Sequence, residues 1–342
     1  MNSLNTPIAW LCAVAVAASA FLAFRDSSSH VVVYTALDRS FSEPIFELFE
    51  ERTGIEVRAV YDSESTKTVG LVNRIRGERD RPRCDVFWNN EIVNTLRLRR
   101  EGYLEPCSPR GAKSFPEQYR DAEGHWHGFA ARARVLIVNT DLVPETGFPS
   151  ALRDLADPRY RGRTAIAKPL FGTTASHVAC LWSRLGEEAT RSLLESFKEN
   201  DIQIHGGNKG CAVAVGTGQA AFGLTDTDDA MIEVDAGRPV RVVYPDGGPD
   251  GIGTLFLPNT LALIKGGPRP REALQLIEFL LSPQVEGLLA EGPSAQIALG
   301  REAKRNTRVR GPTQVRSFEV DFSSAATSFE AARRVVEERF LR

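Results

Sequence analysis

The chain has 342 residues, 25% of them charged, and its formal net charge is −2. This length predicts two domains of ordinary size, each large enough to bury a hydrophobic interior. Because acidic and basic residues nearly balance, the composition argues against a nucleic acid or an anionic membrane as a partner of the whole molecule.

Residues 1–28 have the pattern of an export signal. An apolar stretch, IAWLCAVAVAASAFLAF, runs from Ile8 to Phe24 and is followed by polar residues. The small residues Ala18 and Ala20 offer a cleavage site, yet a stretch of about 17 apolar residues comes close to the length that spans a bilayer. We therefore expect residues 1–28 to be a signal peptide or an N-terminal anchor, and the rest of the chain to lie outside the cytoplasm.

Export changes what the cysteines predict. Four of the five cysteines follow the export signal, in a compartment that permits disulfides. Two disulfides, with three ways to pair them, and four buried free thiols are equally open expectations. The four cysteines are Cys84, Cys107, Cys180 and Cys211.

The first part of the chain alternates strands and helices, as expected of an α/β fold with parallel strands. Ser42 is expected to cap the first helix and Gly54 to end it. The expected strands are 30–37, 55–62 and 84–89, and the expected helices are 42–54, 65–80 and 91–102.

The second part repeats this alternation and then returns toward the first. A strand pair is expected in 253–266, followed by two helices in 271–292, and 323–342 reads as an amphipathic packing helix. The strands expected before these segments are 133–139, 163–167, 203–207, 220–225 and 241–246, and the helices are 175–186, 189–200 and one that begins at Asn208.

Polar side chains follow most of the predicted strands. In a sheet with parallel strands the carboxyl ends form the ligand-binding edge. Any one of these side chains could simply cap a helix, but their number favours a binding site. They are Asp38, then 63–67, Asn90 and Glu91, and in the second part Gly172, Thr173, Thr174, Asn208, Thr225, Asp226, Thr227 and Asp228.

The charges at this edge sort into two groups. The turn GTTASH, at a helix start, offers hydroxyls and N–H groups to an anion. Arg132 and Arg134 lie two apart on a strand, and we expect one to face this anion and the other to face solvent or a structural carboxylate. Opposite charges come from Asp38, Glu91, Asp226 and Asp228, a wall of oxygen suited to a metal ion or an ammonium group, with Asp229 expected to cap the next helix.

The sequence offers no support for catalysis. It contains no GxSxG, P-loop or HExxH motif, and its histidines have no nucleophile at a recognisable spacing. We therefore expect a binding protein and no enzyme.

Several segments, in order, resemble the periplasmic solute-binding proteins of ABC importers. The segments include YTALDRSFSEPIFELFEERTGIEV, DVFWNNEIVNTLRL, FAARARVLIVNT, PLFGTTASH, FGLTDTDDA and LLSPQVEGLLAEGPSAQIAL. The chain is most similar to the ferric-iron-binding branch, whose neighbours bind thiamine, polyamines and aminoethylphosphonate. The resemblance implies a two-lobed periplasmic-binding-protein fold (type II), with mixed sheets flanked by helices and a ligand cleft between the lobes.

The resemblance also implies the division of the chain and its partners. Lobe 1 would comprise 29–133 with 258–305, lobe 2 would comprise 134–257, and 306–342 would form C-terminal packing helices. The protein would deliver its ligand from the periplasm to an ABC permease in the inner membrane. The sequence gives no reason to expect an oligomer, so a monomer is expected. If the N-terminal segment is retained, a tethered ligand sensor is the alternative.

The resemblance leaves two ligand classes open. Ferric iron would be a transported ligand held by Asp38, Glu91 and Asp228, with phosphate or carbonate on the GTTASH turn. However, Thr227 and Asp228 stand where many iron binders have twin tyrosines. The alternative is a zwitterionic or cationic organic solute (2-aminoethylphosphonate, thiamine or a polyamine), with its amine against the aspartates and the ring of Tyr34 or Trp88. Iron is placed first on the breadth of the resemblance.

Overall fold

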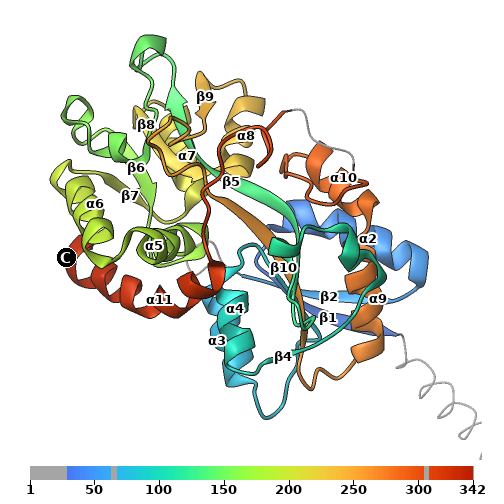
Figure 1. The fold of residues 1–342 in the computed structure, drawn as a ribbon. Helices are drawn as coiled ribbons and strands as arrows, with labels where there is room; N and C mark the ends of the chain where they lie inside the picture. Colours follow the sequence, from blue (N-terminus) through green and yellow to red (C-terminus); the bar gives the residue numbers. More distant parts are fainter. Residues whose placement is uncertain (1–28, 63–67, 304–307, 342) are drawn as a thin grey trace, which may run out of the picture.

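The computed structural model describes residues 29–62, 68–303 and 308–341. The predicted export signal and the polar stretch 63–67 therefore lie outside the described residues. A mixed sheet runs through the molecule in the order β2-β1-β3-β10-β5-β8-β6-β7, with β4 beside β10 and β9 beside β5 (Figure 1). Its strands are β1 (His30–Thr35), β2 (Glu56–Tyr61), β3 (Val86–Asn89), β4 (Leu104–Glu105), β5 (His127–Asn139), β6 (Thr164–Ala167), β7 (Gln203–His205), β8 (Phe222–Asp226), β9 (Val240–Val243) and β10 (Phe256–Ile264).

The long strand β5 connects the two halves of the sheet. It is buried along its whole length and is antiparallel to β10 and to β8. Its pairing changes within one step, because Ala133 lies opposite Phe256 of β10 whereas Arg134 lies opposite Asp226 of β8. β1 is parallel to β2 and β3 in one half, and β6 is parallel to β7 and β8 in the other. Two parallel groups joined by antiparallel strands form the two-lobed α/β architecture.

Helices follow the strands largely where the hydrophobic pattern places them. Gly54 ends the first helix with φ of 70°, as predicted. Ser42 does not cap that helix, because Asp38 holds the N-cap position and the Ser42 hydroxyl lies inside the helix, where it donates to the Asp38 carbonyl at 3.1 Å. The helices are α2 (Arg39–Thr53), α3 (Val69–Gly77), α4 (Val93–Arg100), α5 (Gly172–Leu185), α6 (Glu187–Glu199), α7 (Asn208–Gly216), α8 (Thr227–Asp235), α9 (Pro270–Leu280), α10 (Pro283–Glu291) and α11 (Phe322–Val335).

The prediction of a strand pair in 253–266 is wrong, since this segment forms the single strand β10. Pro258 suggests a break because it has no N–H for a sheet ladder. The strand accommodates it at an irregularity, where the register with β5 shifts between Pro258 and Asn259. The strand therefore continues from the centre of the molecule into the first half of the sheet.

The C-terminal helix α11 packs against both α5 and α4, as the red helix below α5 shows (Figure 1). Arg97 of α4 pairs with Glu330 of α11, and the Arg97 guanidinium lies over the Phe329 ring at 4.3 Å. α11 thus contacts helices that follow strands of both halves of the sheet. Among the described residues no helix is long and apolar enough to cross a bilayer.

All four cysteines of the described chain are free thiols, which decides between the two expectations. Cys84, Cys180 and Cys211 are buried and Cys107 is half-buried. Burial raises the pKa of Cys107 to about 11 and that of Cys211 to about 12. These thiols behave as small apolar side chains of the interior.

Candidate functional site

A small cavity of about 20 Å³ lies between the two halves of the molecule, at the carboxyl ends of the parallel strands. This volume accommodates about one water-sized particle. Asp38 and Asn90 line it from the first half, and Arg132 lines it from β5. The second half contributes Lys168, Gly172, Thr173, Thr174, Asn208, Asp226, Asp228 and Asp229.

Three helices of the second half begin at this cavity. α5 starts at Gly172 after β6, α7 starts at Asn208 after β7, and α8 starts at Thr227 directly after β8. Gly172 has φ of 54°, a conformation that other residues adopt only with strain. The N-terminus of a helix carries a partial positive charge and free N–H groups, so this wall favours negative charge.

Arg134 is completely buried and donates hydrogen bonds to four side chains at the starts of these helices. Its Nη1 donates to Asp226 Oδ1 at 2.7 Å and to Asn208 Oδ1 at 3.0 Å. It also reaches both threonines of the GTTASH turn, Thr173 Oγ1 at 3.2 Å and Thr174 Oγ1 at 3.1 Å. Burial alone would raise the pKa of the Asp226 carboxyl, but Arg134 and Arg132 outweigh burial and hold it below its ordinary value.

Arg132 is the arginine that lines the cavity. It is 2% exposed, and its Nη1 donates to Asp228 Oδ2 at 3.4 Å. Its Nε and Nη2 have no hydrogen-bond partner in the described part of the chain. The other arginine, Arg134, faces the buried carboxylate of Asp226, which is one of the two alternatives expected for it, and does not face solvent.

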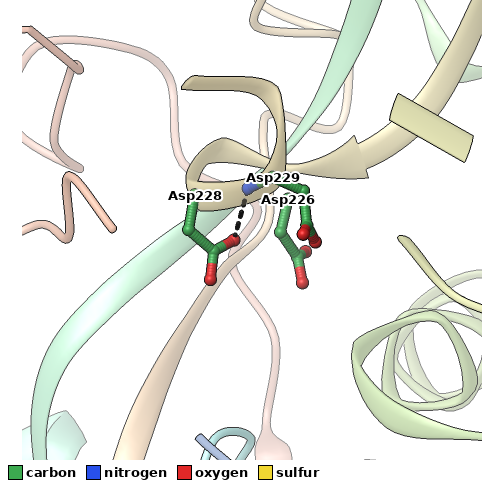
Figure 2. A group of neighbouring side chains, drawn as sticks. All are labelled: Asp226, Asp228 and Asp229. Atoms are coloured by element: carbon green, nitrogen blue, oxygen red, sulfur yellow. Dashed lines mark hydrogen bonds between the residues drawn. The ribbon is translucent and has the colours of Figure 1, made fainter. Parts of the chain in front are cut away.

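Asp226, Asp228 and Asp229 group on one side of the start of α8 (Figure 2). One carboxylate oxygen from each lies within 4.8 Å of the others. The prediction that Asp229 caps α8 is wrong: Asp226 holds the N-cap position, and the Asp229 N–H donates to Asp228 Oδ1 at 3.1 Å. Asp229 instead lines the cavity.

Glu91 and Tyr34 are not among the residues that line this cavity. Glu91 is fully buried and accepts the N–H groups of Val93 and Asn94 at the start of α4. It also accepts the Ser176 hydroxyl of α5 at 2.5 Å, a bond that joins the two halves. The Tyr34 hydroxyl donates to Glu78 at 2.8 Å.

Other candidates have structural contacts. The Thr225 hydroxyl donates to the Asn208 carbonyl at 3.1 Å, and Thr227 Oγ1 accepts the Ala133 N–H at 3.2 Å. Trp88 is completely buried beside Phe46, with ring centroids 5.5 Å apart, so its face is covered. These three residues contribute contacts between the strands and helices around the cavity and do not line the cavity themselves.

Lys168 and Asp229 line the cavity although sequence reasoning gave neither a binding role. Lys168 stands directly after β6, at the same strand edge that predicted Gly172. The strand-end rule, by which ligand-binding residues follow the carboxyl ends of the strands, could therefore have predicted Lys168. The position of Asp229 depends on the first turn of α8, which no sequence pattern specified.

A two-lobed α/β fold with a polar cavity between its halves is the architecture of the periplasmic binding proteins. The family model of bacterial extracellular solute-binding proteins matches residues 94–310. This match covers more than half of the chain, and the protein belongs to that family. The predicted resemblance to periplasmic solute-binding proteins is confirmed, and the family is one of transport proteins that bind substrates without converting them.

Curated relatives carry names from two ligand classes. "Iron uptake protein A1" of Synechocystis is 26% identical over 269 residues, which cover 76% of this chain and 73% of the relative. The "Fe(3+)-binding periplasmic protein" of Serratia marcescens is 28% identical over 213 residues, 61% of each chain. A "Putative 2-aminoethylphosphonate-binding periplasmic protein" of Salmonella typhi is 21% identical over 256 residues, 74% of this chain and 73% of the relative.

Solved structures confirm the predicted fold class. The apo ferric ion-binding protein A of Pasteurella haemolytica superposes with a TM-score of 0.80 at 24% identity, covering 91% of this chain and 97% of that one. Iron-bound HitA from Pseudomonas aeruginosa gives 0.81 at 23% identity, covering 90% and 99%. AfuA from Actinobacillus pleuropneumoniae, with fructose-6-phosphate bound, gives 0.81 at 18% identity, covering 92% and 100%. At these identities the structures establish the fold.

Proposed function

We propose that this protein is the extracytoplasmic solute-binding component of an ABC importer, and that ferric iron with an accompanying anion is its cargo. The observation that carries the proposal is the pairing of opposite charges in one cavity. Asp38, Asp228 and Asp229 offer carboxylate oxygens, whereas Arg132 offers two N–H donors without a partner in the described chain. Carboxylate oxygens suit a hard cation, and a guanidinium suits an anion.

The carboxylates proposed for iron differ in one member from the set expected from sequence. Glu91 caps α4 and bonds to Ser176, so its oxygens are already used. Asp229 takes its place in the proposal, because its carboxylate lines the cavity beside that of Asp228. The iron-related names of two relatives support this cargo.

A zwitterionic organic solute is the second candidate, and the chemistry of the cavity lining favours it. Among the described residues that line the cavity there is no tyrosine, histidine or cysteine. An ammonium group needs only carboxylates, whereas the phenolate and imidazole ligands that strengthen iron binding are missing from this lining. A phosphonate or carboxylate on Arg132 and an amine on the aspartates would satisfy both charges, as a 2-aminoethylphosphonate-like solute does.

Transport would depend on motion of the two lobes about β5 and β10. We propose lobe 1 as 29–133 with 258–305 and lobe 2 as 134–257, because the pairing of β5 changes at Ala133 and Arg134. A ligand that contacts both lobes stabilises the closed form by the difference between its affinities for the two forms. The closed monomer would then dock on its permease in the periplasm and release the cargo.

A thermal-shift screen tests these proposals. Metal-stripped protein is heated with ferric citrate, with and without phosphate or carbonate, and separately with 2-aminoethylphosphonate, thiamine or a polyamine. A ligand that binds the native state raises the melting temperature with the logarithm of its concentration over Kd. Stabilisation by ferric iron supports the iron carrier, and stabilisation by an aminophosphonate without iron supports the second candidate. No shift with any of them contradicts both.

A further inference from the structure

Thr173 of the predicted anion turn, together with Arg134 and Asn208, donates to one carboxylate of the chain itself, that of Asp226. Asp226 Oδ1 accepts Arg134 Nη1 at 2.7 Å, and its Oδ2 accepts the Thr173 hydroxyl at 2.6 Å. The Asn208 amide completes the set, with Nδ2 3.0 Å from Asp226 Oδ2. These donors come from β5 and from the starts of α5 and α7, and they surround the carboxylate as they would surround a bound oxyanion.

The other two hydroxyls of the turn are also engaged, since Ser176 donates to Glu91. The Thr174 hydroxyl donates to Asn208 Oδ1 at 3.1 Å, and Thr174 Oγ1 in turn accepts Arg134 Nη2. Each threonine has one hydroxyl proton, so neither can also donate to an added anion without breaking the network. Asp226 is 3% exposed and Arg134 is fully buried. Replacing the Asp226 carboxylate by an anion from solvent would break this buried ion pair and would therefore be costly.

We propose that Asp226 is a built-in anion that occupies the pocket formed by Thr173, Asn208 and Arg134 and closes this pocket to free phosphate or carbonate. The inference deepens the proposed function of the cavity. Asp226 would then determine specificity, because its carboxylate takes the place that inorganic phosphate or carbonate would otherwise fill beside the cargo. Recognition of an anionic group on the cargo then falls to Arg132, which lines the cavity and whose buried Nε and Nη2 have no hydrogen-bond partner among the described residues.

The test removes the built-in carboxylate and supplies an external one. Melting of Asp226→Ala and of the wild-type protein is followed in sodium phosphate and in sodium chloride of equal ionic strength, without iron or any organic solute. In the variant Thr173, Asn208 and Arg134 lose the carboxylate that they share, so phosphate should bind there and raise the melting temperature. The wild-type protein should gain much less. Asp235→Ala is the matched control, since Asp235 is exposed at the opposite end of α8, the helix that Asp226 caps, and pairs with Arg308.

Two results would overturn the inference: phosphate stabilises the wild-type protein as much as Asp226→Ala, or it does not stabilise the variant. If Asp226→Ala does not fold, Asp226→Ser gives the same comparison, because its shorter side chain also removes the carboxylate from the pocket and serine is a favourable residue at the N-cap of α8. This experiment contains no cargo. Failure of the proposed function would appear in the ligand screen, whereas failure of this inference would appear here, and the two are therefore distinguishable.

Discussion

Arg132→Lys should weaken binding of the cargo while leaving the cavity charge unchanged. Arg132 is 2% exposed, its Nη1 reaches Asp228 at 3.4 Å, and its Nε and Nη2 have no partner among the described residues. A guanidinium can present these two donors side by side to one oxyanion, whereas an ammonium acts as a point charge. Lysine should therefore lose about one charge-assisted hydrogen bond to the ligand.

Such a bond contributes about 1.5–3 kcal/mol when one partner is charged. The expected rise in Kd is about 10- to 150-fold. Isothermal titration calorimetry with the cargo identified by the thermal-shift screen measures it directly. Arg159→Lys is the matched control, because Arg159 is exposed and pairs with Asp157 away from the cavity. An unchanged Kd for Arg132→Lys would refute the assignment of Arg132 to the anionic group of the ligand.

Three further predictions concern the interior. Arg134→Met should lower the free energy of unfolding by about 3–5 kcal/mol in urea titrations, since it removes the only ion-pair partner of the buried Asp226 among the described residues, and adding Asp226→Leu should recover part of this loss. Burial, reinforced by Arg134 and opposed by Asp226, lowers the pKa of His177 to about 3, so the unfolded chain binds a proton at pH values where the native chain does not. The free energy of unfolding should therefore fall by about 1.5 kcal/mol as the pH is lowered from about 6.5 to about 5. Urea titrations at each pH measure this change, and His177→Gln should make the free energy of unfolding less dependent on pH. Alkylation in denaturant without a reductant should modify every thiol of the described chain, and an unmodified thiol would contradict the free state of Cys84, Cys107, Cys180 and Cys211.

The strand-end rule located most of the cavity from sequence, and its failures have local causes. Asp38 and Asn90 line the cavity as that rule expects, because the parallel strands β1 and β3 end at the same edge. Glu91 follows Asn90 by one residue, but its carboxylate turns back to the free N–H groups of α4. Tyr34 lies inside β1, and its hydroxyl bonds to Glu78. A pattern of residue types identifies the edge but does not determine which way each side chain turns.

The roles of the two arginines could not be assigned from their spacing. Arg132 and Arg134 share a face of β5, so the period of the strand does not distinguish them. Their neighbours across the sheet do, because Arg134 lies opposite Asp226 and pairs with it, whereas Arg132 lies opposite Leu257 and its nearest carboxylate is Asp228. Likewise, the spacing of the cysteines carried no information on the distances between their thiols.

The balance of charge around the cavity bears on the class of ligand. Arg134 and Asp226 neutralise each other within the wall, so the groups left for a ligand are Arg132 and Lys168 on one side and three carboxylates on the other. A purely cationic ligand would leave Arg132 buried with only a long contact to Asp228, and a purely anionic one would bring its charge close to Asp228 and Asp229. A buried charge without a partner is costly, and repulsion between like charges rejects wrong ligands. Both costs are avoided by a cargo that carries the two charges together, whether as a metal ion with its chelating anion or as a zwitterion.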